Sequence, residues 1–255
     1  MRRRTQFEII PKQPYDFRLT VRKPAGWELF TSEEVFEHET LWTGIRFKAG
    51  PVGLKIQSCG TVERPRVLVG VYSDREVPKG DGEKLREILG VSLGADQDLR
   101  EFYDFARKDR ILKHVVESLY GMHDTQGVSL FNSVILAICL QMARLKRSRE
   151  MMEAIDRKYG ETIEFDGRTV LLQPAAGSIA KLDEYSFAKA CKLGYRAKYI
   201  IGSAKMIEAG FPDMAEILRM PPDEAKERLL ELPGIGDYAA DIINPHGGFP
   251  IDAWS

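Results

Sequence analysis

The chain has 255 residues, which is enough to bury a substantial core in one large domain or two modest ones. Its composition, 44% hydrophobic and 29% charged, excludes a low-complexity or disordered protein. The formal net charge of -1 excludes a global basic signature for nucleic acid, so any nucleic-acid site has to be local.

The three cysteines, Cys59, Cys139 and Cys191, lie far apart and form no C-x-x-C motif. This spacing argues against a disulfide framework, a zinc site and an iron–sulfur cluster in the sequence, and it fits a reducing compartment. The opening stretch MRRRTQFEIIPKQP is basic but has no apolar region of signal-peptide length, and no later stretch is long enough to span a bilayer. We expect a soluble cytoplasmic protein, nucleoid-associated if it is prokaryotic, with no membrane partner.

Up to about residue 75 the pattern is typical of β-strands. Short runs of β-forming residues alternate with Pro and Gly, namely YDFRLTV (residues 15–21), TGIRFKAG (43–50), VGLKIQSCG (52–60) and RPRVLVGVYS (64–73). A helix is expected around Glu83 to Leu89, where it ends at a glycine. The pattern predicts an N-terminal antiparallel sheet domain over residues 1–95.

From Asp98 onward the hydrophobic period is helical. DLREFYDFARKD predicts a short amphipathic helix, and VSLFNSVILAICLQ (residues 128–141) is apolar on nearly all sides, which predicts the central helix of a bundle. Further helices are expected over residues 144–160, 178–193, 196–209 and 222–231. The fold class is therefore α+β, with an all-helical domain over residues 96–255.

The stretch LPGIG, which begins at Leu232, ends one helix and is followed at once by another. Gly234 and Gly236 allow positive φ and leave backbone N–H groups uncovered, and Asp237 is a suitable N-cap for the second helix. Uncovered amides at the positive end of a helix dipole bind anions. A plain tight turn is the alternative, but LPGIG between two helices (about 222–245) favours a helix-hairpin-helix that grips a nucleic-acid backbone.

Beyond the second helix, Pro245 and the pair Gly247-Gly248 lead into FPIDAWS and to Asp252. Taken alone, such an Asp is more often a helix N-cap than a catalyst. Here a short helix and a return loop bring it back toward the hairpin. A carboxylate beside an extruded nucleotide can stabilise positive charge on the sugar and orient a water, as glycosidic cleavage requires.

Hairpin, Gly/Pro-rich loop and Asp252 together resemble the helix-hairpin-helix (HhH-GPD) DNA glycosylase superfamily, especially its 3-methyladenine and 8-oxoguanine DNA glycosylase branch, which has an N-terminal sheet domain. The resemblance covers residues 98–255 well and the sheet domain more loosely. It implies a base-excision-repair enzyme that hydrolyses the N-glycosyl bond of a flipped base in damaged double-stranded DNA, with Asp252 as the catalytic carboxylate. It also implies a monomer that requires no cofactor.

In lyase-competent members of this family, a lysine nucleophile stands two positions after the second hairpin glycine. Here that position is Tyr238, so the resemblance implies a monofunctional enzyme in which Asp252 activates water. An aromatic residue there is similar to the alkylbase glycosylases, where it lines the base pocket, and Ile242 is expected beside it. Packing between hairpin and core is an equally weighted reading of Tyr238.

Two further segments resemble the 8-oxoguanine branch. LGYRAKYI supplies Tyr195 and Arg196, which by resemblance enter the gap left by the flipped base. ICLQMARLKR supplies Gln141 and Met142 as the DNA wedge, and Arg147 as a second contact to the opposite base. The remaining basic residues of that segment are read as a solvated helix face.

The resemblance also implies phosphate contacts from the Gly234 and Gly236 amides. A monovalent cation, Na⁺ or K⁺, is expected at the hairpin on backbone carbonyls, those of Leu230, Leu232 and Ile235. Family members continue into at least one more helix after the catalytic Asp, whereas this sequence stops at Ser255. We therefore expect the helical domain as given to lack its C-terminal helix.

The motifs disagree on the substrate. Tyr238 favours an alkylated purine such as 3-methyladenine, or a deaminated one, and by a small margin this is the reading we adopt. Arg147 and Arg196 favour 8-oxoguanine, with or without AP-lyase activity from a lysine elsewhere, such as Lys205 or Lys181. The second alternative is a non-catalytic DNA-binding module, against which Asp252 argues, because phosphate binding alone does not call for an anion.

Overall fold

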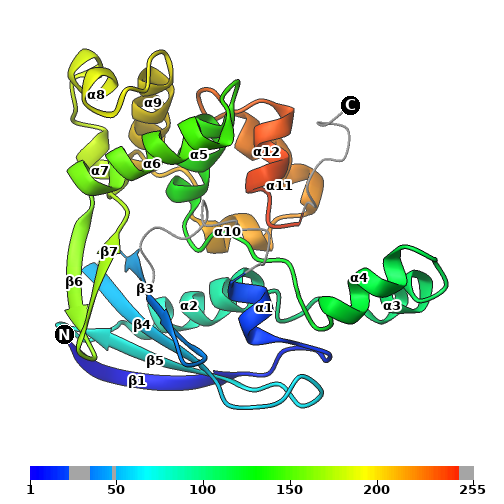
Figure 1. Cartoon of the computed structure of the whole chain (residues 1–255). Coiled ribbons are helices and arrows are strands. Elements are labelled where there is room, and N and C mark those ends of the chain that lie inside the picture. The colour runs from blue at the N-terminus through cyan, green and yellow to red at the C-terminus, as the bar shows by residue number, and fades with distance from the viewer. Residues whose placement is uncertain (23–34, 48–49, 247–255) are drawn as a thin grey trace. The chain divides into compact units, whose positions relative to one another are not determined.

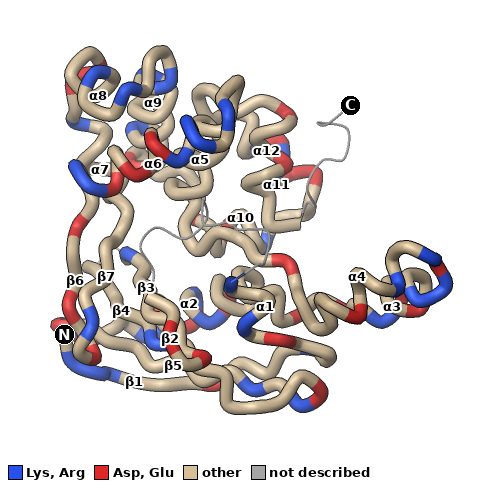
Figure 2. Tube along the Cα trace, viewed as in Figure 1, with Lys and Arg blue, Asp and Glu red and all other residues tan. Residues whose placement is uncertain are grey.

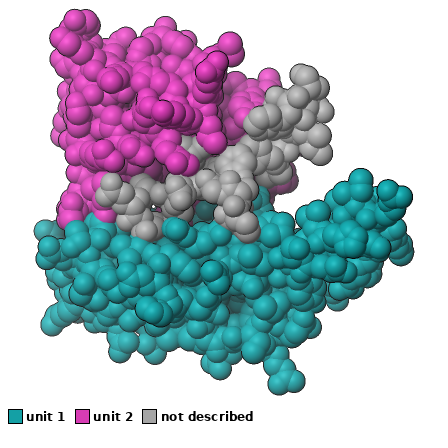
Figure 3. Space-filling view, viewed as in Figure 1, with its two compact units in different colours: residues 1–126, 163–170 teal, residues 127–162, 171–255 magenta. Residues whose placement is uncertain are grey.

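A computed structural model of the chain describes residues 1–22, 35–47 and 50–246 (Figure 1). It divides into two compact units, which Figure 3 colours separately: Met1–Gln126 with Ile163–Val170, and Gly127–Thr162 with Leu171–Ser255. Antiparallel strands dominate the first unit and helices the second, which confirms the α+β class. In the described ranges, no helix is both long enough and apolar enough to cross a membrane.

The first unit is built on a five-stranded antiparallel sheet in the order β1-β5-β4-β3-β2. Its buried face alternates along the strands, so Leu54, Ile56 and Val69 are almost fully buried. Helix α2 (Lys79–Ser92) adds Leu85 and Leu89 to the buried side chains. The strands are β1 (Arg2–Ile9), β2 (Val35–Glu37), β3 (Thr40–Phe47), β4 (Gly50–Ser58) and β5 (Val67–Ser73).

The strand predicted over residues 15–21 is wrong, because Phe17–Val21 form the short helix α1. The Asp16 carboxylate accepts a hydrogen bond from the Leu19 amide at 2.8 Å and so caps the helix N-terminus. Phe17 and Thr20 point into the interior from this helix. The Asp16 cap and the burial of Phe17 and Thr20, three residues apart, therefore favour a helix over the strand that the alternating pattern of residues 15–21 predicts.

Helices α3 (Arg100–Ala106) and α4 (Leu112–Ser118), expected in the helical domain, belong to the first unit. Backbone hydrogen bonds tie the flanking segments to that unit: Lys12 N to Ala95 O at 2.7 Å, and Asp16 N to Gly121 O at 2.7 Å. The unit therefore continues past residue 95, the predicted end of the sheet domain.

The second unit packs around α5 (Leu130–Leu140), which contacts α6, α9 and α12. Nine of its residues are buried, from Leu130 to Cys139, which confirms the predicted central helix. The segment predicted as one helix over residues 178–193 is instead two helices, α7 and α8. The others are α6 (Leu145–Tyr159), α7 (Ala176–Ile179), α8 (Glu184–Cys191), α9 (Arg196–Glu208), α10 (Met214–Arg219), α11 (Pro222–Leu230) and α12 (Asp237–Ile243).

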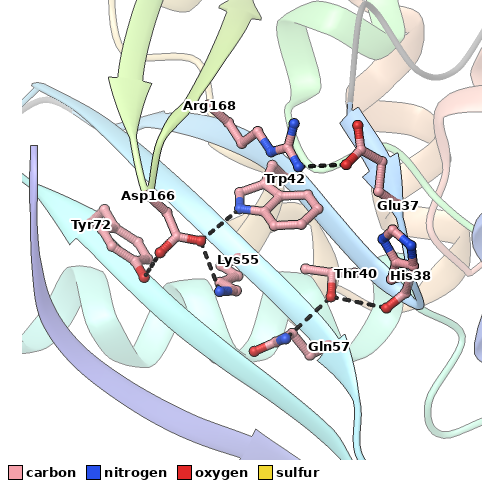
Figure 4. Close-up of polar contacts among 9 residues, drawn as sticks. All are labelled: Glu37, His38, Thr40, Trp42, Lys55, Gln57, Tyr72, Asp166 and Arg168. Atoms are coloured by element: carbon pink, nitrogen blue, oxygen red, sulfur yellow. Dashed lines mark hydrogen bonds and ion pairs between the residues drawn. The ribbon is translucent and has the colours of Figure 1, made fainter.

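A β-hairpin that the sequence analysis did not predict, β6 (Glu161–Phe165) with β7 (Arg168–Leu172), interrupts the helices. The tip of this hairpin, Ile163–Val170, belongs to the first unit. At the turn, the Asp166 carboxylate accepts hydrogen bonds from Trp42 Nε1 at 2.9 Å and Tyr72 Oη at 3.0 Å, and Lys55 Nζ lies 2.8 Å away (Figure 4). We name Asp166 with these three donors the Asp166 hub.

The Asp166 hub is electrostatically favourable. Burial by itself would raise the pKa of the Asp166 carboxyl, but the hydrogen bonds from Lys55, Trp42 and Tyr72 together hold that pKa below its ordinary value. The hairpin tip is thus fastened to the sheet by an ionised carboxylate.

Candidate nucleic-acid interface

The hairpin predicted from LPGIG is present in the second unit, between α11 and α12. Helix α11 begins with Pro222 at its first turn, and the Ile235 amide donates to Leu232 O at 3.0 Å to close the turn. Gly234 has φ 81°, and a Cβ there would stand 2.6 Å from Tyr199 Cγ, so both backbone and packing require glycine.

Gly236 differs from expectation, because its φ of -104° and ψ of -176° are extended rather than left-handed. It is Gly236, not Asp237, that forms the N-cap of α12, and Asp237 occupies the first turn. Gly236 is exposed, and no atom of residues 1–22, 35–47 or 50–246 lies within 4 Å of where a Cβ would stand. Among the described residues, no side chain caps this helix start, so none of them blocks the approach of a phosphate oxygen to its amides.

Two side chains hold the carbonyls of the hairpin turn. Ser203 Oγ, from α9, donates to Pro233 O at 3.1 Å. Gln141 Nε2, from the loop after α5, donates to Gly234 O at 2.7 Å. Close packing supports these contacts, because a Cβ at Gly202 would lie 3.1 Å from the Pro233 ring.

The loop between α5 and α6, residues 141–144, presents the predicted wedge. Met142 has φ 47°, in the left-handed region, and its side chain is 95% exposed. Gln141 instead points toward the hairpin, to Gly234. The two predicted wedge residues therefore face in different directions, and only Met142 is free to enter a duplex.

Arg196, predicted to enter the gap left by the flipped base, and Arg147, predicted to contact the opposite base, are both engaged with backbone carbonyls in this structure. Arg196 is 9% exposed and donates from Nε to Ile138 O at 3.2 Å and from Nη2 to Gln141 O. Arg147 donates from Nη2 to Lys192 O, where α8 ends. Both roles toward DNA stay predictions. The sequence supplies the residue type at these positions but not the direction of the side chain.

The remaining predicted contacts are placed as follows. Tyr195 is 48% exposed at the start of α9, with its ring stacked under the Arg196 guanidinium at 4.7 Å. Tyr238 is half-buried on α12, and Ile242 is buried one turn later. Exposed basic residues lie at the end of the α5–α6 loop (Arg144), in the first turns of α6 and α9 (Lys146 and Lys198) and at the end of α8 (Lys192). Figure 2 marks the Lys and Arg positions along these elements.

Helices α11 and α12 are also joined by an ion pair. Lys226 Nζ lies 2.8 Å from the Asp241 carboxylate and 3.8 Å from that of Asp237. The hydrogen bond to Asp241 raises the pKa of Lys226 above its ordinary value. Lys226 is therefore held as an ammonium ion and is not prepared to act as an amine nucleophile at the hairpin.

Asp252, the predicted catalytic carboxylate, lies outside the described residues, as do Gly247 and Gly248. The described chain leads toward it through Asn244, a buried residue that the sequence analysis missed. Its Nδ2 donates to Pro222 O at 3.2 Å, and its Oδ1 accepts from the His246 amide at 3.1 Å. An asparagine directly after an apolar helix is the sequence signal for such a cap.

The predicted cation at the hairpin involves main-chain oxygens. Among residues 1–22, 35–47 and 50–246, no group of three or more His, Cys, Asp or Glu side chains is placed to hold a metal ion. Leu232 O already accepts the Ile235 amide but retains a second lone pair, which is compatible with a monovalent cation. A site on the carbonyls of Leu230, Leu232 and Ile235 stays a prediction.

Comparison with curated proteins identifies relatives over most of the chain, although a scan against models of known protein families finds no match. The chain is 31% identical over 193 residues to a probable N-glycosylase/DNA lyase of Methanothermobacter thermautotrophicus, covering 67% of this chain and 61% of that protein. It is 23% identical over 197 residues to a DNA-3-methyladenine glycosylase of Bacillus subtilis, covering 75% of this chain and 65% of that protein. The chain thus spans less than two thirds of either relative.

Solved structures share the fold. A 3-methyladenine DNA-glycosylase from Archaeoglobus fulgidus matches with a TM-score of 0.71 at 22% identity, over 93% of this chain and 78% of that one. An 8-oxoguanine glycosylase/lyase from Clostridium acetobutylicum matches with a TM-score of 0.61 at 17% identity, over 99% of this chain and 83% of that one.

A five-stranded antiparallel sheet and a helical unit that ends in a helix-hairpin-helix define the class of fold. In sequence and in fold, the chain is therefore similar to proteins of the helix-hairpin-helix (HhH-GPD) DNA glycosylase superfamily.

Proposed function

We propose that this protein is a DNA glycosylase of base-excision repair that hydrolyses the N-glycosidic bond of a damaged purine flipped out of duplex DNA. One observation carries the proposal: the glycine-rich hairpin turn and the loop with the exposed Met142 are joined by a hydrogen bond from Gln141 Nε2 to Gly234 O. The names of its relatives, which include N-glycosylase/DNA lyase and DNA-3-methyladenine glycosylase, support the same activity.

In the proposed binding mode, the hairpin grips the phosphate backbone and Met142 fills the space of the extruded nucleotide. Backbone amides at Gly234 and Gly236 donate to phosphate oxygens without reading sequence. An apolar wedge compensates for the unstacking of one base step, which costs a few kcal/mol. The exposed basic residues Arg144, Lys146, Lys192 and Lys198 add local attraction to a chain whose net charge is -1.

In the proposed chemistry, the bond between the sugar C1′ and the base nitrogen breaks, and the base leaves with the bonding electron pair and takes up a proton. The Asp252 carboxylate stabilises the oxocarbenium-like sugar and accepts a proton from the water that bonds to C1′. Tyr238 stands where lyases of this family carry a lysine, so the products are a free base and an intact abasic strand.

For the substrate, we propose an alkylated or deaminated purine. Tyr238 is half-buried on α12 and offers an aromatic face on which an electron-poor base can stack. The likeness to a 3-methyladenine DNA-glycosylase from Archaeoglobus fulgidus is in accord with this substrate. The likeness to an 8-oxoguanine glycosylase/lyase favours 8-oxoguanine as the second candidate, with or without lyase activity.

The test is base release from duplexes carrying 3-methyladenine, hypoxanthine, 8-oxoguanine or uracil, quenched in parallel with and without alkali. We expect strand breaks only after alkali, and on the duplexes with an alkylated or deaminated purine. Breaks without alkali would reveal a lyase lysine. Binding without release from any duplex would favour the DNA-binding module instead.

The role of Asp252 has its own test. Asp252→Asn removes the charge and keeps the shape of the side chain, so we expect DNA binding to be retained and base release to fall by roughly 10³-fold or more. Single-turnover base release and fluorescence anisotropy measure the two quantities separately. Wild-type release rates in the variant would overturn the proposed mechanism.

A further inference from the structure

The C-terminal end of α5 is capped by side chains from other helices. The last carbonyls of a helix lack intrahelical partners and need donors from elsewhere. Arg196, nine-tenths buried, donates to Ile138 O at 3.2 Å and to Gln141 O, while Ser148 Oγ donates to Cys139 O at 2.9 Å. A cation at this end also suits the helix dipole. The main chain at Gln141 is therefore fixed from one side.

The side chain of Gln141 is fixed from the other side. Its Nε2 donates to Gly234 O at 2.7 Å, in the middle of the hairpin turn. Both the carbonyl and the amide side chain of this one residue are thus committed, the first to α9 through Arg196 and the second to the hairpin.

Met142 follows directly and has φ 47°, a left-handed conformation that is strained for a residue with a side chain. Its side chain, at 95% exposed, has no packing that would compensate. The conformation therefore has to be maintained by the constraints on its neighbours, and Gln141 carries both of those described above. The fixed Gln141 forces the next residue outward.

We infer that Gln141 is a positioning residue, not a wedge: it ties the phosphate-binding turn to the loop that carries Met142, so that gripping the backbone and inserting the wedge become one event. The inference rests on the proposed function and deepens it. In this arrangement Arg196 holds the Gln141 main chain, and Ser203 supports the same turn without any link to the wedge.

The experiment compares two duplexes that differ only at one position, one undamaged and one with a tetrahydrofuran abasic-site analogue, whose gap the wedge can fill. Gln141→Met keeps the length of the side chain and removes the donor. Ser203→Ala is the matched control, since it removes the other side-chain hydrogen bond to the turn. Fluorescence anisotropy gives the affinity of each full-length variant for each duplex, and thermal unfolding verifies that each is folded.

We expect wild-type protein to prefer the tetrahydrofuran duplex. Gln141→Met should lower that preference by roughly 3- to 10-fold, the effect of one net hydrogen bond, with affinity for the undamaged duplex nearly unchanged. Ser203→Ala should weaken binding to both duplexes by the same factor and leave the preference intact. Met142→Ala should lower the preference similarly, and combining it with Gln141→Met should add little, because the two residues act as a unit.

Two results would overturn the inference while leaving the proposed function standing. One is a Gln141→Met variant that loses affinity for both duplexes equally, as Ser203→Ala does, since Gln141 would then only support the turn. The other is a double variant in which the two effects multiply, which would make Gln141 and Met142 independent. A wild-type protein without any preference, and without base release, would remove the proposed function and the inference together.

Discussion

Two polar arrangements fasten a loop in this molecule, and they are built from different chemistry. In the first unit the Asp166 hub holds a hairpin tip with an ionised carboxylate and three side-chain donors. In the second unit Gln141 holds the wedge loop with a neutral amide, and its partners are backbone carbonyls and the guanidinium of Arg196.

The choice of a charged or a neutral fastening corresponds to whether the side chains beside it, those near Asp166 or those near Gln141, are buried or exposed. Around Asp166 the neighbouring aromatic rings are buried or half-buried, with Phe165 packed over Gly53, where a Cβ would lie 2.5 Å from the ring. Beside Gln141 stands Met142, which is 95% exposed. The charged hub secures a buried contact, whereas the neutral contact directs a side chain into solvent. The contribution of the Asp166 hub to the unfolding free energy should therefore depend on pH, whereas the contribution of the Gln141 hydrogen bond should not.

The largest effect is expected at the hairpin turn. Gly234→Ala places a Cβ 2.6 Å from Tyr199 Cγ at φ 81°, so we expect a loss of roughly 2–4 kcal/mol in unfolding free energy. Chemical denaturation measures it. Gly236→Ala is the control, because its backbone is extended and, in the part of the chain that the structure describes, nothing lies within 4 Å of the added Cβ. Equal losses in the two variants would contradict the geometry.

Removing the charged hub should have the next largest effect. Asp166→Ala leaves the donors of Lys55, Trp42 and Tyr72 without their common acceptor, at a cost of about 2–3 kcal/mol in unfolding free energy. Glu117→Ala, an exposed carboxylate 3.7 Å from His114, serves as the control in the same denaturation experiment and should be nearly neutral. A variant at Asp166 as stable as the control would show that the hub contributes nothing.

The contrast in pH dependence sharpens the comparison. The pKa of Asp166 is lowered in the folded protein, so its stabilisation is fully present above the unfolded value of about 4 and is lost as pH falls through the folded pKa. We expect the stability difference between wild type and Asp166→Asn to shrink in acid below about pH 4. The difference between wild type and Gln141→Met should stay constant over the same range. Parallel pH curves for Asp166→Asn and wild type would argue against an ionised hub.

The smallest effect is expected for a single neutral hydrogen bond to the hairpin. Ser203→Ala removes the bond to Pro233 O and leaves the volume almost unchanged, so the loss in unfolding free energy should be about 1 kcal/mol, independent of salt. Denaturation at low and high ionic strength measures it. A strong salt dependence would mean that charges, not this bond, dominate the support of the turn.

The sequence is most informative where one local pattern decides the structure. The apolar run from Leu130 to Cys139 predicts the central helix, because a helix that is apolar on all sides has to be buried. The hairpin follows from LPGIG for a similar reason, since Gly234 is required by the backbone itself. The β6–β7 hairpin also has a local signal, an Asp-Gly turn between two short β-rich runs, but helical patterns surround it on both sides.

Side-chain direction is where sequence reasoning is weakest. Arg196 and Gln141 carry the residue types expected of DNA contacts, yet both are turned inward to carbonyls that only the folded chain brings near. Asp16 illustrates the same limit in the backbone, because its cap on α1 prevails over an alternating strand pattern. The position of Asp252 in the sequence is informative, but the geometry of its loop lies outside the described residues.

The hairpin tip that carries Asp166 has a consequence for how the chain acquires its structure. The first unit is discontinuous, because Ile163–Val170 arrive only after a stretch of helical unit has been made. During synthesis on a ribosome, Trp42 and Tyr72 cannot form their hydrogen bonds to the Asp166 carboxylate until residue 166 has emerged. Contacts between residues so far apart in sequence slow folding through the entropy of closing the intervening loop. A fragment ending at residue 126 would lack the Phe165 ring that packs over Gly53. To express the first unit alone, residues 163–170 therefore have to be joined to that fragment.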